Sequence, residues 1–326
     1  MRTGNTLALN VIAYEMRTTM ASIAVVIATA GRPDAARDII NTLEDSRIPD
    51  FFGFLSAPDD SDVPDMPIPE KWTVCTGVRG ASSQRNKALD MIPETVSYVF
   101  FFDDDSVPRH DYISSMLDVL GSNPEAVAAT GRVVLDGAAA GTEFTLEQCE
   151  RALAESLRPS RSVTSRPPAV TDSLYGCNFC VRWAATRDLR FDEDLPLYSW
   201  LEDLDYAKRA LSRGQLLRVD SAVTAHRGSS TGGRTSHRRF GYSQIANPLH
   251  LRKKRSLTIA QTVREMMRPS LKNLALALVP SARFASRRSR LSGNLLAAGH
   301  ALVGRAHPSK MLNINDGDTR DVEVRS

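Results

Sequence analysis

The sequence predicts an α/β fold built on a mostly parallel, Rossmann-like sheet, and two features indicate it. First, apolar segments of strand length alternate with helical segments over residues 22–134, as in sheets whose strands are joined by right-handed helical crossovers. Second, residues 22–29 and 98–102 are continuous apolar runs, which are typical of strands buried on both faces. Because ligands bind at the carboxyl ends of parallel strands, we expect a site there.

Turn residues and periodicity place the other elements. Gly31 and Pro33 follow the first strand and begin a helix, and Ser82 or Ser83 caps a later one. Residues 136–171 are rich in Ala, Ser, Arg and Pro, and we interpret them as a variable insertion. The predicted strands cover residues 22–29, 51–56, 72–75, 98–102, 126–134, 173–181 and 216–219, and the predicted helices include residues 82–91, 143–157 and 202–213.

Charge divides the chain into two parts. The net charge of the 326 residues is +3. Residues 1–226 hold 22 basic and 33 acidic residues, whereas residues 227–305 hold 16 basic residues and a single acidic one. An acidic front and a basic back indicate two different tasks.

Several classes of protein are disfavoured. Four cysteines in this length give no disulfide framework, which favours a reducing interior, and no stretch reaches the roughly 18 apolar residues of a transmembrane helix. Cys177 and Cys180 point to opposite faces if they lie on one strand, so we expect a structural role. The basic pairs and runs after residue 237 belong to no recognisable nucleic-acid module, so no nucleic-acid partner is expected.

Three consecutive aspartates, Asp103, Asp104 and Asp105, follow the buried strand that ends at Phe102. Like charges at close range raise one another's pKa unless a cation neutralises them. Carboxylates at this position therefore indicate a divalent metal, Mg²⁺ or Mn²⁺, whose shell substrate phosphates can complete. The alternative is a solvated acidic turn that caps the next helix.

A second acidic group, Glu202 and Asp203, begins a predicted helix. Acidic residues at a helix N-terminus can simply interact with the helix dipole. Trp200 just before them also allows a functional interpretation, since an aromatic ring beside a carboxylate can hold a sugar near a base. His226 is open to two interpretations, a ligand or an ordinary surface or core histidine.

Six short motifs in this order resemble a family 2 glycosyltransferase of the GT-A fold, and the resemblance covers roughly residues 22–228. The motifs are Val26-Ile27-Ala28-Thr29, Gln84-Arg85-Asn86, Phe102-Asp103-Asp104-Asp105, Gly176-Cys177-Asn178, Glu202-Asp203-Leu204-Asp205 with Arg209 and Gly214, and His226.

The resemblance implies roles for individual residues. Asp103, Asp104 and Asp105 match the family's DXD motif. The resemblance implies that Asp103 and Asp104 lie at the donor, with Asp104 near the ribose, and that Asp105 binds the metal. Asp203 matches the catalytic base. The resemblance also implies contacts with the donor: Thr29, Arg32 and either Asp59 or Asp60 contact the nucleoside, Arg85 the diphosphate and Gly176 the donor sugar. Trp200 and Glu202 would contact the acceptor, and His226 would contact the metal or a phosphate. The segment 57–62 departs from the family pattern, so either aspartate can be the one that meets the base.

From these observations we expect a domain order and a membrane surface. Residues 1–20 are interpreted as a flexible extension, 21–240 as the catalytic domain with a nucleotide-binding half at about 21–135 and an acceptor half at about 172–228, 241–305 as a basic amphipathic helical extension, and 306–326 as a disordered tail. Within 250–290, the apolar residues 271–279 lie among basic residues, Arg264, Arg268, Arg283, Arg287 and Arg288. This pattern fits an interfacial helix on anionic lipid or, alternatively, a packing helix with a solvated basic face.

The expected function is a metal-dependent inverting glycosyltransferase. It would move a sugar from a nucleotide-diphosphate sugar to a glycan or lipid-linked acceptor in surface polysaccharide synthesis, as a cytoplasmic, peripheral protein of the inner membrane face. The alternatives are a sugar-1-phosphate nucleotidyltransferase, for which residues 30–33 are a poor phosphate loop, and a non-catalytic sugar-nucleotide-binding protein.

Overall fold

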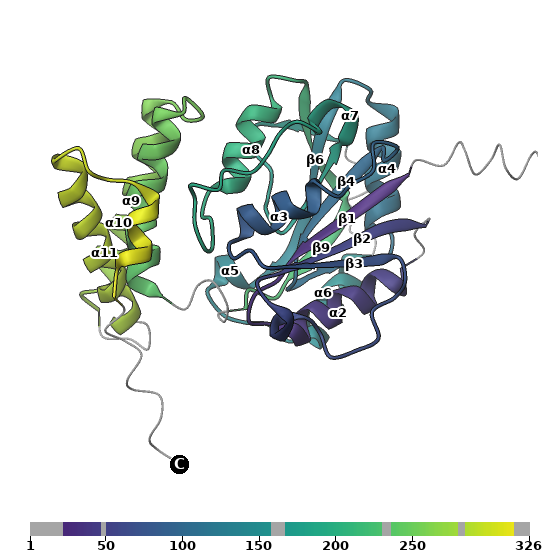
Figure 1. The fold of residues 1–326 in the computed structure, drawn as a ribbon, viewed down its shortest axis with the longest axis horizontal. Coiled ribbons are helices and arrows are strands. Elements are labelled where there is room, and N and C mark those ends of the chain that lie inside the picture. Colours follow the sequence, from purple (N-terminus) through teal and green to yellow (C-terminus); the bar gives the residue numbers. More distant parts are fainter. Residues whose placement is uncertain (1–21, 47–49, 158–166, 230–235, 280–283, 316–326) are drawn as a thin grey trace, which may run out of the picture.

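A computed structural model describes residues 22–46, 50–157, 167–229, 236–279 and 284–315 (Figure 1). The predicted extension at residues 1–20 lies outside this range. The described residues form a nine-stranded sheet in the order β3-β2-β1-β4-β8-β6-β9-β5, with β7 paired to β9. The strands are β1 (Ile23–Ala28), β2 (Phe51–Ala57), β3 (Trp72–Thr76), β4 (Tyr98–Asp103), β5 (Ser106–Pro108), β6 (Ala126–Asp136), β7 (Ala169–Thr171), β8 (Asn178–Arg182) and β9 (Gln215–His226).

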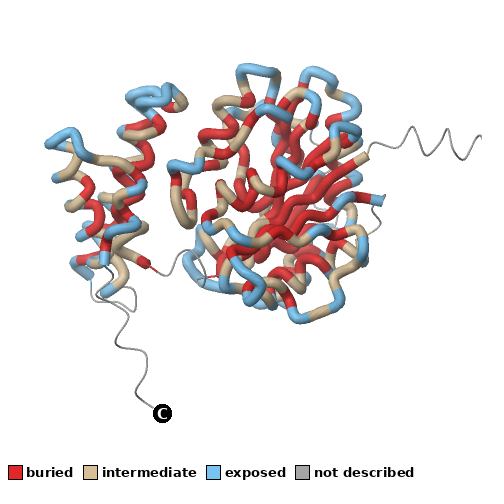
Figure 2. Tube along the Cα trace, viewed as in Figure 1, coloured by how far each residue is buried: buried red, intermediate tan, exposed pale blue. Residues whose placement is uncertain are grey.

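Strands β3, β2, β1 and β4 pair in parallel, and β6 is parallel to β9, while β8 runs antiparallel between β4 and β6. Helices α2 (Pro33–Glu44) and α4 (Tyr112–Ser122) cover one face, and α3 (Ala81–Leu89), α7 (Trp183–Thr186) and α8 (Glu202–Ala210) cover the other. Alternate residues of β1 enter the two cores, and Figure 2 shows that the central strands are mostly buried. The predicted α/β fold is thus confirmed.

Several predicted bounds are wrong. The strand predicted at 173–181 covers only β8, because residues 173–177 form a connecting segment at the site. The strand predicted at 216–219 continues to His226, since β9 pairs along its length with β6 and then with β5. Within the segment interpreted as an insertion, the helix predicted at 143–157 is confirmed as α6 (Leu146–Ser156), and a short helix, α5 (Gly137–Ala140), precedes it.

The C-terminal helical unit consists of α9 (His237–Lys253), α10 (Ile259–Leu276), α11 (Phe284–Leu302) and the 3₁₀ helix η3 (Pro308–Asn313), and it stands beside the sheet domain (Figure 1). It has a small core of its own around Tyr242 and Ala297. A Cβ at Gly241 would lie 2.0 Å from the Arg290 carbonyl oxygen, so only glycine permits α9 and α11 to cross this closely.

The prediction of a disordered tail at 306–326 is wrong for its first part, because Pro308 and Met311 of η3 are buried against α9. Residues 316–326 lie outside the described range. Among the described helices, none is both long and apolar enough to cross a membrane.

Polar contacts and a small apolar cluster join the helical unit to the sheet domain. Asp192 accepts hydrogen bonds from His250, at 2.8 Å, and from Lys254. Asn247 on α9 donates to the Trp200 carbonyl at 2.8 Å. Leu195 packs with Leu251 and Leu257. The boundary between the two parts lies at the start of α9, and the basic segment is packed against the loop that precedes α8.

Candidate active site

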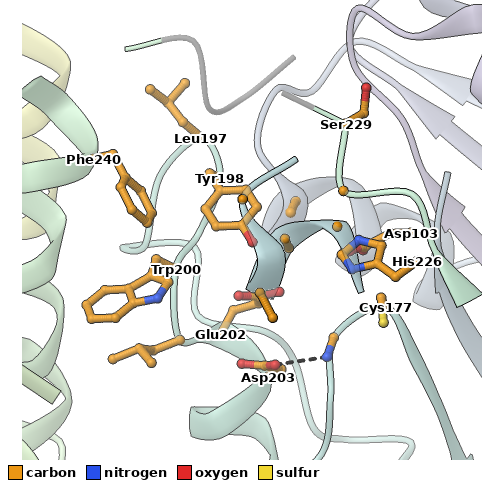
Figure 3. A pocket seen from close by; sticks show the side chains of 18 of the residues that line it. Asp103, Cys177, Leu197, Tyr198, Trp200, Glu202, Asp203, His226, Ser229 and Phe240 are labelled. Carbon is orange, nitrogen blue, oxygen red and sulfur yellow. Dashed lines mark hydrogen bonds and ion pairs between the residues drawn. The ribbon is translucent and has the colours of Figure 1, made fainter. Parts of the chain in front are cut away.

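A cavity of about 710 Å³ lies between the carboxyl ends of the central strands and the helical unit (Figure 3). Asp103 and His226 lie on one side of it, and Trp200 and Phe240 lie on the other, beside the helices. Glu202 and Asp203 lie between these two sides. The motifs singled out in the sequence thus converge on one hollow.

The three aspartates after Phe102 have different surroundings. Asp103 faces the cavity with its side chain 26% exposed. Asp104 is buried; its Oδ2 accepts from Thr29 Oγ1 at 2.7 Å, and its Oδ1 pairs with Arg32 at 2.6 Å. Asp105 is also buried, and its Oδ2 accepts from the Ser229 backbone N–H at 2.7 Å.

His226, at the end of β9, faces two of these carboxylates. Its Nε2 lies 3.2 Å from Asp105 Oδ1 and 3.9 Å from Asp103 Oδ2. Its Nδ1 is held by Asp136 Oδ1 at 3.2 Å, and Tyr175 donates to the other Asp136 oxygen at 2.7 Å. Nδ1–H bonded to a carboxylate leaves Nε2 as a ligand atom, the usual arrangement of a metal-binding histidine.

The residues fit a divalent metal. Ligand atoms of Asp103, Asp105 and His226 all lie within 4.8 Å of one another, and two carboxylates with one imidazole suit Mn²⁺ or Mg²⁺. Burial alone would lower the pKa of His226, but nearby Cys177 and the carboxylates raise it well above 6.5. The site therefore stabilises a positive charge at this point.

Arg85 on α3 ties the two acidic groups together. Its guanidinium is buried and donates to Glu202 Oε1 and to Asp103 Oδ1, both at 2.7 Å, and to the Gly176 carbonyl at 3.1 Å. A buried, charged fork between two carboxylates fixes their separation. Arg85 thus sets the distance from the candidate metal ligands to the start of α8.

The carboxyl groups of Glu202 and Asp203 have different hydrogen-bond donors, and the pKa of each is raised. Burial and the charge of Asp203 raise the pKa of Glu202 to about 8 although Arg85 opposes this shift. Burial also raises the pKa of Asp203, against hydrogen bonds from the backbone N–H groups of Gly176, at 2.9 Å, and Leu204, at 2.7 Å. Asp203 is oriented by backbone donors and makes no ion pair within 4.0 Å with a described residue.

The loop before α8 is held in an unusual conformation. Leu197, Ser199 and Leu201 have φ values of 59°, 53° and 76°, which cost free energy in residues with a Cβ. Contacts on two sides maintain them: Leu197 accepts from the Ala81 N–H at 2.9 Å, and α9 binds the Trp200 carbonyl. The helical unit thus helps to position the loop that leads into Asp203.

Most of the predicted site residues meet at this cavity. Thr29, Arg32, Arg85, Asp103, Gly176, Trp200, Glu202, Asp203 and His226 line it. Asp104 and Asp105 do not line the cavity but pair with Arg32, which does. Asp59 and Asp60 are exposed and do not line the cavity. Instead the buried Asp62 accepts from the Gly31 N–H, in the loop that follows β1.

The sequence interpretation missed three kinds of residue. Asp136 was missed because β6 was expected to end two residues earlier, and Tyr175 because its segment was expected to be strand. The basic lining from the helical unit, which includes Lys272 and Arg290, was assigned to a membrane surface instead. No local spacing in the sequence indicates Asp136 or Tyr175, because their contacts join residues far apart in the chain.

No protein-family model and no curated protein matches the sequence. The structure is similar to the mannosyltransferase PcManGT from Pyrobaculum calidifontis, in complex with GDP-Man and Mn²⁺, with a TM-score of 0.50, 13% identity and coverage of 90% of this chain and 86% of that one. It is also similar to TarS 1-349 from S. aureus, in complex with UDP-GlcNAc, with a TM-score of 0.51, 13% identity and coverage of 87% and 92%. The chain has the GT-A-like fold of these glycosyltransferases.

Proposed function

We propose that the chain is a metal-dependent glycosyltransferase that moves a sugar from a nucleoside diphosphate to an acceptor hydroxyl with inversion of configuration. The observation that carries this proposal is the single cavity shared by Asp103 and His226, as metal ligands, and Asp203, as a base. The fold shared with PcManGT and TarS, which bind GDP-Man with Mn²⁺ and UDP-GlcNAc, supports it.

Asp103, Asp105 and His226 would hold Mn²⁺ or Mg²⁺. A divalent cation held there would supply positive charge that stabilises the negative charge developing on the leaving diphosphate. Asp136 keeps Nε2 of His226 directed at this point. Arg85, buried between Glu202 and Asp103, holds the donor side and the base at a fixed separation.

Asp203 is the base in this proposal. Its carboxylate accepts the proton of the acceptor hydroxyl while that oxygen attacks the anomeric carbon from the side opposite the diphosphate. One displacement inverts the configuration. Glu202 is less suited because its Oε1 is already occupied by the Arg85 guanidinium.

Replacing Asp203 tests the assignment. Asp203→Asn keeps the shape of the side chain and should lower sugar transfer at least about 10³-fold, while the Kd for the nucleotide measured calorimetrically with Mn²⁺ changes little. Asp118→Asn, an exposed carboxylate on α4, is the matched control and should be fully active. Transfer by Asp203→Asn at the wild-type rate would remove Asp203 from this role.

We further propose that the enzyme works at the anionic inner surface of the cell membrane in surface glycan synthesis. Support comes from a stripe of exposed apolar residues at three- and four-residue spacing along α10 and just beyond it: Ile259, Val263, Met267, Leu271, Leu274 and Leu278. Arg264 and Arg268 flank the stripe. Apolar side chains edged by basic ones suit an interfacial helix on anionic lipid.

Vesicle flotation tests the membrane proposal. Wild-type protein should float with phosphatidylcholine vesicles that contain phosphatidylglycerol, and the double variant Val263→Glu, Leu271→Glu should not. Val170→Glu, at a 72% exposed residue of β7, is the control for an added charge elsewhere. Equal flotation of the double variant and the control would exclude α10 as the membrane surface.

A further inference from the structure

The end of the cavity away from Asp103 and His226 is basic. Phe240 of α9 lies 6.1 Å from Trp200 and 5.9 Å from Tyr198, measured between ring centroids, and Figure 3 shows Phe240 and Trp200 at this end. The Arg290 guanidinium packs on the Phe240 ring at 4.8 Å. Lys272 of α10 and Arg287 of α11 line the same cavity.

Buried contacts hold part of this basic wall in place. Arg287 donates to Asn273 Oδ1 at 3.0 Å. Asn273 is completely buried and donates to Gln244 at 2.8 Å and to Asn294 at 2.9 Å. A satisfied amide network between three helices orients the guanidinium from behind. The single carboxylate of these helices, Glu265, pairs with Arg264 and does not line the cavity.

The cations at the donor end contact carboxylates. Arg32 contacts Asp104 and Asp105, and Arg85 contacts Asp103 and Glu202. Negative charge there is matched by arginines and, in the proposed function, by a metal. Arg290 packs on Phe240, which contacts the ring of Trp200, the aromatic residue that the sequence resemblance assigns to the acceptor, and Lys272 and Arg287 line the same cavity. An anion bound by these three cations would therefore belong to the second substrate.

We propose that Lys272, Arg287 and Arg290 form a subsite for a phosphate group of the acceptor. Three cationic side chains on one wall suit a phosphate, because guanidinium groups bind it in a bidentate manner and an ammonium adds a point charge. The inference rests on the proposed function, since it takes Asp203 as the point that the acceptor hydroxyl must reach. The phosphate can belong to a soluble ester or to a lipid headgroup.

Charge variants on α10 provide a matched test. Lys272→Glu and Arg268→Glu change the net charge equally, one turn apart on the same helix, but only Lys272 lines the cavity. Glycerol phosphate is titrated into the full-length protein with and without nucleoside diphosphate and Mn²⁺. Lys272→Glu should weaken its binding about tenfold or more, as should Arg290→Gln, whereas Arg268→Glu should bind it like the wild type.

A second arm separates the sources of the phosphate. Phosphatidylcholine vesicles with and without phosphatidic acid are used as the probe for Lys272→Glu and Arg290→Gln. Arg268 flanks the stripe of the proposed membrane surface, so Arg268→Glu is the control for glycerol phosphate only. Loss of glycerol phosphate binding alone identifies a soluble ester, and loss of binding to both probes identifies a headgroup; each result supports the subsite. Unchanged binding of both probes by Lys272→Glu and Arg290→Gln overturns it.

Measuring nucleotide binding separates a failure of the phosphate subsite from a failure of the proposed function. If Lys272→Glu weakens nucleoside diphosphate binding but leaves glycerol phosphate binding intact, the wall serves the donor and the inference is wrong. Wild-type protein that binds no nucleotide with Mn²⁺ would contradict the proposed function, while the titration without nucleotide still reports on the subsite. Thermal unfolding of each variant tests whether the helices remain folded.

Discussion

At the scale of single residues, the three adjacent aspartates have separate tasks because of their neighbours. Asp104 is closed off by Thr29 and Arg32, whereas Asp103 and Asp105 share His226. We expect Asp105→Asn to weaken Mn²⁺ binding about tenfold or more, since it removes a charged oxygen ligand. Isothermal titration with Mn²⁺ measures this. Asp118→Asn should bind Mn²⁺ like the wild type, and equal binding by Asp105→Asn would contradict the metal site.

The surroundings of Asp203 also predict a pH dependence. Burial raises its pKa above the ordinary value of 3.8 despite the two backbone N–H donors. A base acts in its deprotonated form, so kcat/KM should rise with pH through this raised pKa and should be reduced at pH values where an exposed aspartate is already ionised. A pH profile of sugar transfer tests this. An acid limb centred at 3.8 or below would contradict it.

At the scale of elements, the packing of Gly176 against the start of α8 controls the base. A Cβ at Gly176 would lie 3.3 Å from both Asp203 Oδ2 and Glu202 Oε1. We expect Gly176→Ala to displace Asp203 by a few tenths of an ångström and to lower kcat about tenfold with little loss of stability. Gly121→Ala, on α4 with nothing within 4 Å of the added Cβ, should keep full activity. Equal kcat values for the two variants would contradict the close approach.

Which elements could be predicted depended on whether local patterns or distant contacts determine them. Strand β1 was predictable because residues on both of its faces are apolar. The length of β9 was not, since its second half, which ends at His226, is fixed by pairing with β6 and β5 rather than by an apolar run. The site residues that carry a motif were found, but Asp136 and Tyr175 act only through His226, a contact that no local spacing indicates.

At the scale of the whole molecule, the basic segment is more than an appendage. The sequence separates acidic and basic parts near His226, but the helical unit lines the cavity and holds the loop that precedes Asp203. Charge could indicate that two parts exist. It could not indicate that they share one site, because this depends on contacts between residues far apart in the chain, such as Asn247 with Trp200.

The acidic residue at the junction of the two parts, Asp192, should stabilise the molecule. Burial would raise its pKa, but hydrogen bonds from His250 and Lys254 outweigh this effect and hold the pKa below 3.8. A depressed pKa in the folded state contributes stability that is present above 3.8 and is lost as the pH falls through the folded pKa. We expect Asp192→Asn to lower the free energy of unfolding at pH 7 by about 1–3 kcal/mol.

Urea unfolding at pH 7 and at pH 3 measures this contribution and its sign. The difference in free energy of unfolding between wild type and Asp192→Asn should be full at pH 7 and smaller at pH 3. At pH 3 Asp192 binds a proton in the unfolded chain but stays charged in the folded state, so unfolding is favoured more than at pH 7. Asp194→Asn, whose side chain is 63% exposed and lies 4.0 Å from His250, should change the free energy by less than about 0.5 kcal/mol. A difference that grows on acidification would mean that Asp192 is strained by burial rather than stabilised by its partners, and the junction would then depend on Leu195, Leu251 and Leu257.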